Sequence, residues 1–219
     1  MRTQDYWIDQ YKKKSALWIH DDNAKRPHAL LTSGKHSNGF FNSRLVIPDE
    51  ALLRAAASDL LELFIINRGN FAEIEGVVGP QTGATKLAEL VSKQCPAGCF
   101  FASPAKKEIN GVKSMVFSDE ERALLPGKSI LLCEDVLTTG GSVDLTDNAV
   151  TDAGGFVLPF VLVLVNRSGL TEVNGKKIVA LISHPMPTWM ADDCDLCKKG
   201  SEAIRPKGPE EWARLNANY

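Results

Sequence analysis

Residues 130–142 read ILLCEDVLTTGGS. The first four are apolar, which is typical of a strand buried on both faces. Two acids, Glu134 and Asp135, follow where this strand would emerge, and a turn of threonine, glycine and serine comes next. Ser142 can cap a helix over residues 143–153, because a serine oxygen accepts the unpaired amides of a first helical turn. The order of strand, acids, glycine loop and helix predicts an anion-binding cradle.

The cradle fits a ligand with a phosphate at one end and a diol at the other. Gly140 and Gly141 let backbone amides approach a phosphate without an intervening Cβ, and the hydroxyls beside them add donors. The acid pair repels phosphate, so it suits neutral hydroxyls, a metal ion or positive charge in a transition state. A ribose 5-phosphate has both halves. An ordinary strand, turn and helix with an acidic turn is the alternative, which the complete order of residues disfavours.

This stretch resembles the phosphoribosyl pyrophosphate (PRPP) signature of type I phosphoribosyltransferases, in which four apolar residues and two acids precede a Thr-Gly-Gly-type loop. The resemblance implies that Glu134 and Asp135 bind the ribose hydroxyls and are catalytic candidates, with Asp135 also placed to stabilise cationic character or relay a proton. It also implies Mg²⁺ as the cofactor and a homodimer. The remaining ribose-phosphate positions are Val136, Leu137, Thr138, Thr139, Gly140, Gly141 and Ser142.

A second glycine loop follows another short apolar run, at residues 76–78. It leads into a helix that should extend to about residue 93, and it resembles the family's pyrophosphate loop. Backbone amides and the positive end of the helix dipole are the physical candidates for binding the diphosphate. The positions concerned are Pro80, Gln81, Thr82, Gly83 and Ala84. Two such loops, each behind a buried strand, are stronger evidence than one.

In residues 29–47, two apolar stretches flank a Ser-Gly-Lys turn and predict a hairpin. Taken alone, a β-turn with core phenylalanines is the preferred interpretation. The segment, however, resembles the orotate branch of the family. That resemblance implies that Lys35 contacts anionic groups of the ligand, including the pyrophosphate, and that Phe40 and Phe41 flank the base, where ring stacking would orient it.

Arg167 follows an apolar strand expected at residues 156–165, where the family places an arginine that binds the carboxylate of orotate. A guanidinium can fork onto a carboxylate with two parallel hydrogen bonds. A solvent-exposed arginine in a loop is the alternative. By the same resemblance Thr138 completes the base-binding set.

Residues 103–121 are mostly polar and correspond to the family's mobile loop over the reaction centre, which in oligomers reaches the neighbouring subunit's site. Lys106 and Lys107 are the catalytic candidates here, because they could supply positive charge to a departing pyrophosphate. The orotate enzymes usually carry arginine and histidine in this loop, and this chain has neither there. This departure argues against orotate, whereas Lys35, Phe40, Phe41 and Arg167 favour it, and on those residues orotate is the expected acceptor. The alternatives are another base, a purine or an unusual pyrimidine, and a PRPP-sensing regulator without catalysis.

Four of the five cysteines fall into two close pairs, which could supply four thiolates to a zinc ion. The alternative is that each pair sits in a turn without a metal. The candidate ligands are Cys95, Cys99, Cys194 and Cys197. His20 and His28 lie beside a polar turn and are expected at the surface.

Composition limits the classes of function. A net charge of −2 and a pI near 6.1 give no electrostatic footprint for nucleic acid or an anionic membrane, which also disfavours a DNA-binding regulator. No apolar run approaches the roughly 20 residues that span a bilayer, and the amino terminus lacks the apolar core of a signal peptide. An odd number of cysteines favours a reducing compartment, so a cytoplasmic location is expected.

Strands alternate with helices from residue 48 to residue 183. The expected architecture is therefore α/β, with a mostly parallel central sheet flanked by helices. We expect a single domain over residues 1–219, with this core at residues 48–183. Residues 1–47 and 184–219, called the hood below, would cover the edge of the sheet where the ligand loops meet. A helix is expected over residues 5–20.

Overall fold

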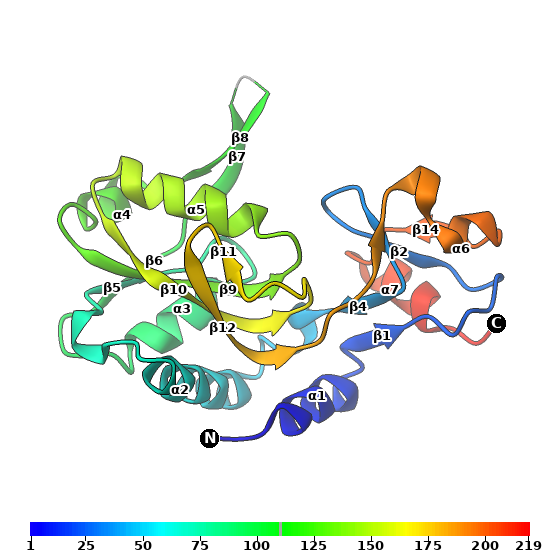
Figure 1. The fold of residues 1–219 in the computed structure, drawn as a ribbon, viewed down its shortest axis with the longest axis horizontal. Coiled ribbons are helices and arrows are strands. Elements are labelled where there is room, and N and C mark those ends of the chain that lie inside the picture. Colours follow the sequence, from blue (N-terminus) through cyan, green and yellow to red (C-terminus); the bar gives the residue numbers. More distant parts are fainter. Residues whose placement is uncertain (110) are drawn as a thin grey trace.

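The chain folds into a larger and a smaller lobe joined side by side (Figure 1). The computed structural model describes residues 1–109 and 111–219. The larger lobe is built on a six-stranded sheet whose pairings are parallel except at β11, which pairs antiparallel with β12. In spatial order the sheet contains β11 (Glu172–Val173), β12 (Lys176–Ser183), β10 (Phe156–Asn166), β9 (Ser129–Leu137), β5 (Gly76–Val78) and β6 (Phe100–Ala102).

Helices cover both faces of this sheet, as the alternation of strands and helices predicts. Successive side chains of β9 point to opposite faces. Leu131 and Cys133 pack with α2 (Glu50–Ile66) and α3 (Thr85–Ser92). Ile130 and Leu132 pack in a second cluster with α5 (Gly141–Asp152), beside α4 (Asp119–Ala123). The apolar run at the start of the signature is therefore buried on both faces, as predicted.

The strand and helix around the signature differ in detail from the expectation. Strand β9 continues through the acid pair to Leu137, because it pairs with β10 along its whole length. Helix α5 begins at Gly141 with Gly140 as its N-cap, so the predicted cap by Ser142 is wrong. Gly140 has φ +86°, and a Cβ there would lie 2.3 Å from Val173 Cγ2. Only glycine fits this cap.

Residues 105–116 form an antiparallel hairpin of β7 (Ala105–Ile109) and β8 (Val112–Val116). The hairpin extends away from both lobes (Figure 1). Its base packs beside α5, and Met115 and Phe117 are buried in the same cluster as that helix.

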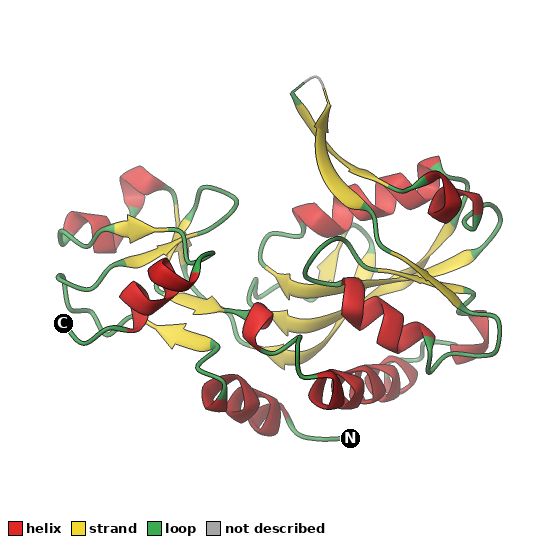
Figure 2. Cartoon of the chain, turned by 180° about the vertical axis from the view of Figure 1, so that it is seen from behind, coloured by secondary structure: helices red, strands yellow, loops and turns green. Residues whose placement is uncertain are grey.

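The hood is assembled from both ends of the chain (Figures 1 and 2). Strand β1 (Leu17–Ile19) pairs with β4 (Gly39–Phe41). A four-stranded sheet has the order β13 (Thr188–Trp189), β3 (His36–Ser37), β2 (His28–Leu30) and β14 (Ala203–Ile204). The short helices of these segments are η1 (Ser43–Leu45), η3 (Ala191–Asp193), α6 (Asp195–Lys198) and α7 (Pro209–Asn216). The short helix η2 (Phe71–Glu73) lies in the larger lobe, which is called the core lobe below.

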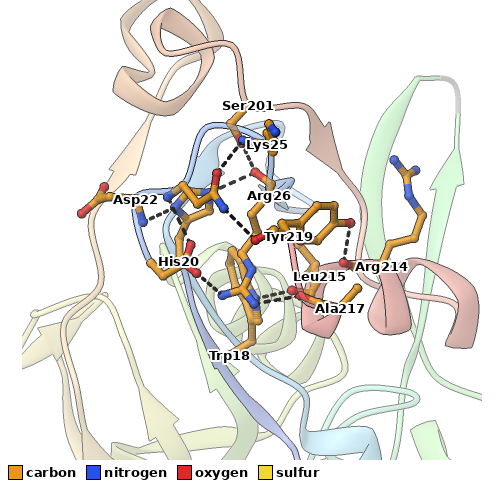
Figure 3. Close-up of polar contacts among 12 residues, drawn as sticks. Trp18, His20, Asp22, Lys25, Arg26, Ser201, Arg214, Leu215, Ala217 and Tyr219 are labelled. Atoms are coloured by element: carbon orange, nitrogen blue, oxygen red, sulfur yellow. Dashed lines mark hydrogen bonds and ion pairs between the residues drawn. The ribbon is translucent and has the colours of Figure 1, made fainter.

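Polar contacts fasten the carboxyl-terminal end of the chain to the amino-terminal segment of the hood (Figure 3). The Trp18 indole N–H donates to the carbonyl oxygen of Leu215 at 2.8 Å, and Arg26 Nη2 donates to that of Ala217 at 2.8 Å. The His20 ring lies 3.1 Å from the Arg26 carbonyl oxygen. Beyond α1, the two segments of the hood thus pack on each other although they are far apart in sequence.

Two expectations about the amino-terminal segment are wrong. The predicted helix over residues 5–20 is shorter: α1 spans Gln4–Lys13, Ser15 takes a positive φ, and residues 17–19 form β1. Helix α1 packs on β12 of the core lobe. His20 and His28 are 7% and 0% exposed rather than at the surface, and His28 lies against Ser201 and Cys194 of the carboxyl-terminal segment.

Within residues 1–109 and 111–219, no helix combines the length and the apolar character needed to cross a membrane.

Candidate functional site

Two adjoining cavities open at the carboxyl edge of the central sheet, where the predicted ligand loops meet. Their volumes are about 460 and 320 Å³. Both are lined by Glu134, Thr138 and Ser142 of the signature, and Lys106 of the β7–β8 hairpin also lines both. They therefore form the two halves of one site.

The acid pair lies at the junction of the halves. Glu134 and Asp135 point to opposite faces of β9, since neighbouring residues of a strand alternate. Glu134 is 6% exposed, and its Oε1 accepts the backbone N–H of Asp135 at 3.0 Å. Burial, followed by the nearby charge of Asp135, raises the pKa of Glu134 well above its ordinary value. A carboxyl group in this state can donate as well as accept a hydrogen bond.

The predicted pyrophosphate loop packs directly on this pair. A Cβ at Gly83 would lie 2.4 Å from Asp135 Oδ2, so a side chain at this position would collide with the carboxylate. Loop residues 80–83 line the smaller cavity together with Asp135. The structure thus brings together two loops that are about fifty residues apart in sequence, as parallel strands ending at one edge require.

The larger cavity is lined by the whole predicted ribose-phosphate loop, residues 136–142. The start of α5 turns its unpaired amides toward this side, and its dipole favours an anion. Facing the loop are Lys106, Lys107 and Lys113 from the two strands of the hairpin. This half of the site therefore combines backbone donors with three cations, which suits phosphate groups.

The smaller cavity has an aromatic wall from the hood. Phe40 and Phe41 both line it, as expected. Phe41 is buried and packs edge-on against Tyr11, with ring centroids 5.2 Å apart. Phe40 is half-buried next to Trp212 of α7. Both rings are held by packing, which pre-orients a surface for a planar ligand.

Arg167 supplies a buried positive charge to the smaller cavity. Its side chain is 2% exposed, so the alternative of a solvent-exposed arginine is wrong. Nη1 donates to the Gly39 carbonyl oxygen at 2.9 Å and Nη2 to Ser37 Oγ at 2.5 Å, whereas the buried Nε has no partner. Across residues 1–109 and 111–219 no carboxylate lies within ion-pair distance of it. Burial lowers the pKa of Arg167 to about 10.

A buried cation without a counter-ion is unfavourable in the free protein. Because Arg167 lines the cavity between the pyrophosphate loop and the aromatic wall, an anionic group of a ligand can supply the missing charge. The arrangement is that of a site that selects a planar, negatively charged molecule.

Two predicted site residues, Lys35 and Ala84, are not among the described residues that line the two cavities. Lys35 is partly exposed in the turn between β2 and β3, and its ligand role stays a prediction. Ala84 is fully buried, and its N–H donates to the Pro80 carbonyl oxygen at 3.1 Å, so it shapes the loop from behind.

Sequence reasoning missed several lining residues of the hood. They include two cations at the smaller cavity and two hydroxyl residues shared by both cavities: Arg44, Lys207, Thr32 and Ser33. Thr32 and Ser33 lie in the Thr-Ser-Gly-Lys turn, in which only Lys35 is a predicted ligand residue. Lys207 carried no signal, because only folding brings the carboxyl-terminal segment to the site.

The predicted four-thiolate zinc site is also wrong. Cys95 and Cys99 lie after α3 and pack against the core cluster of the larger lobe. Cys194 and Cys197 lie in the hood, at the start of α6. In the part of the chain that the structure describes, the two pairs do not converge on one point.

Comparison with known proteins agrees with this geometry. The sequence model of the family described as "Phosphoribosyl transferase domain" matches residues 51–189, more than half of the chain. The chain belongs to this family. The match spans the core lobe, including both glycine loops, the hairpin and Arg167, and the resemblance of the signature to type I phosphoribosyltransferases is confirmed.

Similarity to proteins named orotate phosphoribosyltransferase extends over most of the chain. It is 33% identical to the orotate phosphoribosyltransferase of Desulforamulus reducens over 179 residues, with 82% of this chain and 87% of that protein covered. It is 32% identical to the orotate phosphoribosyltransferase of Acidithiobacillus ferrooxidans over 215 residues, with 93% and 96% covered.

Solved structures share the fold. The orotate phosphoribosyltransferase of Aeropyrum pernix aligns with a TM-score of 0.58 and 23% identity, covering 80% of this chain and 91% of that one. An adenine phosphoribosyltransferase from Rhodothermus marinus aligns with a TM-score of 0.55 and 20% identity, covering 81% and 98%. At these identities the likeness speaks for the fold alone. It confirms the predicted α/β class.

Proposed function

We propose that this phosphoribosyltransferase transfers the ribose 5-phosphate of PRPP to orotate, giving orotidine 5-phosphate and pyrophosphate. The observation that carries the choice of base is Arg167, a buried cation without a carboxylate partner among the described residues, beside the aromatic wall of the smaller cavity. Orotate is planar and carries a carboxylate, so it satisfies both features. The orotate phosphoribosyltransferases among its relatives support the same base.

The two halves of the site divide the work of the reaction. The ribose 5-phosphate would lie in the loop of residues 138–142, with the ring hydroxyls at Glu134 and Asp135. A ring nitrogen of the base forms a bond to C1 of the ribose, while the bond from C1 to the pyrophosphate oxygen breaks and its electron pair leaves with the pyrophosphate. The proton of the nitrogen goes to solvent or to a carboxylate. Holding both partners in line supplies much of the rate enhancement.

The charged side chains of the site match the charges that develop in this reaction. The ribosyl centre becomes oxocarbenium-like as the leaving group departs, and Asp135 is the partly exposed carboxylate that can stabilise it. Lys106 lines both cavities and can stabilise the departing pyrophosphate beside the loop of residues 80–83, and Lys107 adds positive charge from the larger cavity. Their presence in the site favours an enzyme over a PRPP sensor that lacks catalysis.

The residues present fit Mg²⁺. This ion takes oxygen ligands and is often held by one or two carboxylates together with substrate phosphates. Asp135 would be the protein ligand, because it lies against the loop proposed to hold the diphosphate. When bound, Mg²⁺ would neutralise charge on the leaving pyrophosphate.

A homodimer is the proposed assembly. The β7–β8 hairpin extends beyond both lobes (Figure 2) and carries lysines that line the site, which suits a segment shared between subunits. Sedimentation velocity should give a species of about twice 23.9 kDa. The cytoplasmic location stays a prediction.

The function is tested by steady-state turnover with PRPP, Mg²⁺ and a panel of orotate, uracil, adenine and hypoxanthine. We expect release of pyrophosphate with orotate and at most weak turnover with the other bases. Binding of PRPP without turnover for any base would exclude the enzyme, whereas a preference for uracil or a purine would exclude only the choice of orotate.

A further inference from the structure

Two histidines and two cysteines from distant parts of the hood converge on one point. Any two of their four ligand atoms lie within 4.8 Å of one another. They come from β2, from β3 and from the turn at the start of α6: His28, His36, Cys194 and Cys197. We call this set the His2Cys2 cluster.

The spacing of these atoms matches tetrahedral zinc coordination. With bonds of about 2.0–2.1 Å to nitrogen and about 2.3 Å to sulfur, tetrahedral angles separate two nitrogens by about 3.3 Å and nitrogen from sulfur by about 3.5 Å. In the cluster, His28 Nε2 lies 3.0 Å from His36 Nδ1. The two sulfurs are each 3.5 Å from His28 Nε2. Cys197 Sγ is 3.3 Å from His36 Nδ1.

A hydrogen bond behind the cluster orients its central histidine. Ser201 Oγ donates to the Arg26 carbonyl oxygen at 2.6 Å, so that the hydroxyl oxygen can accept a second hydrogen bond. Its partner is His28 Nδ1, 2.9 Å away. This chain of contacts favours a proton on Nδ1 and turns the lone pair of Nε2 toward the cluster. Metal-binding histidines are commonly oriented in this way by the partner of their other nitrogen.

The chemistry of the donor set favours zinc in a structural role. Two thiolates and two imidazoles suit zinc, and the two thiolates balance its two positive charges. His28, His36 and Cys194 are buried and Cys197 is half-buried, so the site is enclosed. Four protein ligands leave no open position for a substrate, which distinguishes a structural from a catalytic zinc.

We propose that the His2Cys2 cluster binds one structural zinc ion. The ion would cross-link the carboxyl-terminal segment to the amino-terminal strands, since Cys194 and His28 are 166 residues apart in the chain. Strand β2 leads directly into Thr32 and Ser33 at the cavity, and the carboxyl-terminal segment brings Lys207 there. The zinc would thus hold in place the part of the hood that lines the ligand site. This inference does not depend on the proposed acceptor base.

The first test measures metal in the full chain, purified without chelator or a histidine tag. Elemental analysis should find about one zinc per chain. The Cys194→Ser/Cys197→Ser variant should lose it, whereas the matched Cys95→Ser/Cys99→Ser variant should keep it. A folded wild-type chain without zinc that also takes up none from zinc-supplemented buffer would overturn the proposal, and so would zinc retained by the Cys194→Ser/Cys197→Ser variant.

A second test does not require the double variant to fold. Wild-type chain reconstituted with Co²⁺ should show the intense visible bands of tetrahedral cobalt and a near-ultraviolet thiolate-to-cobalt band, which the Cys95→Ser/Cys99→Ser variant should share. The His36→Cys variant keeps four zinc ligands and should retain the metal, while His36→Ala should bind it at least tenfold more weakly, in line with the loss of one ligand. Absence of the cobalt bands, or equal metal affinity of His36→Ala and wild type, would show a hydrogen-bonded cluster instead.

Discussion

The two lobes assemble their parts of the site in different ways. In the core lobe, the ribose-phosphate loop follows one strand without interruption, and parallel pairing places the second loop beside it. In the hood, the lining residues come from both ends of the chain, and Arg44 Nη1 of one end donates to the Lys207 carbonyl oxygen of the other. The phosphate half of this site is therefore a local property of the sequence, whereas the base half depends on tertiary packing.

Arg167 joins the two halves. It stands just after β10 of the core sheet, but its hydrogen bonds go to Ser37 and Gly39 of the hood. A ligand anion at Arg167 would therefore be held between the lobes. Changes in the core cradle should abolish binding and chemistry for every base, and changes at the contact between the lobes should alter one substrate selectively.

The largest effect is expected in the core cradle. Asp135→Asn removes a charge from the reaction centre at nearly constant shape, so kcat/KM should fall by roughly 10²–10³-fold, the size of loss seen when one electrostatic group of a transition state is removed. The exposed Asp119→Asn on α4 is the matched control and should retain wild-type kinetics. Activity within a few-fold of wild type would remove Asp135 from the mechanism.

The second-largest effect is expected at the contact between the lobes. Arg167→Ala should raise KM for orotate by roughly 30-fold or more, because truncating one partner of a buried charge pair costs about 2–5 kcal/mol, or tenfold per 1.4 kcal/mol. KM for PRPP should change far less. Arg54→Ala, on the exposed side of α2, is the control. Equal losses for both substrates would mean that Arg167 supports the fold of the site rather than the choice of base.

A smaller effect is expected on stability at the helix cap of the cradle. Gly140→Ala and Gly175→Ala both place a side chain at a positive φ, which costs about 1–2 kcal/mol. At Gly140 the new methyl group also meets Val173, whereas nothing lies within 4 Å at Gly175. Denaturant titration should therefore show a greater loss for Gly140→Ala. Equal losses would mean that Val173 moves away freely.

The smallest effect concerns pH. Because the pKa of Glu134 is raised above its usual 4.5, the folded chain keeps a proton that the unfolded chain releases. The free energy of unfolding therefore falls as pH rises from about 4.5 through the raised pKa. Glu134→Gln does not titrate and should lack this fall, so its stability relative to wild type should increase toward alkaline pH. Denaturant titrations from about pH 4.5 upward would measure this difference. If the free energies of unfolding of wild type and Glu134→Gln change in parallel with pH, the pKa of Glu134 is not raised in the folded chain.

Much of the core could be predicted because its signals are local. The apolar run before Glu134 predicted a strand buried on both faces, and the glycines after it predicted a loop and helix start. The error there was one of extent: the acids lie inside β9, because pairing with β10 continues past them. Pairing partners are not visible in a single stretch of sequence.

The hood was predicted less well for the same reason. His28 reads as a surface residue beside a polar turn, yet the carboxyl-terminal segment buries it. The spacing of the cysteines predicts one site from the two cysteine pairs, but Cys194 and Cys197 instead face two histidines. Lys207 had no local feature that marks a ligand contact.

By itself the sequence determined the family, the α/β class and the phosphate cradle, since these follow from residues that are neighbours in the chain and from backbone rules that act over a few residues. The tertiary structure alone decided that Arg167 is a buried cation between the lobes and that two histidines and two cysteines meet in the hood. Those features depend on contacts between segments more than a hundred residues apart, which only the packed chain brings together.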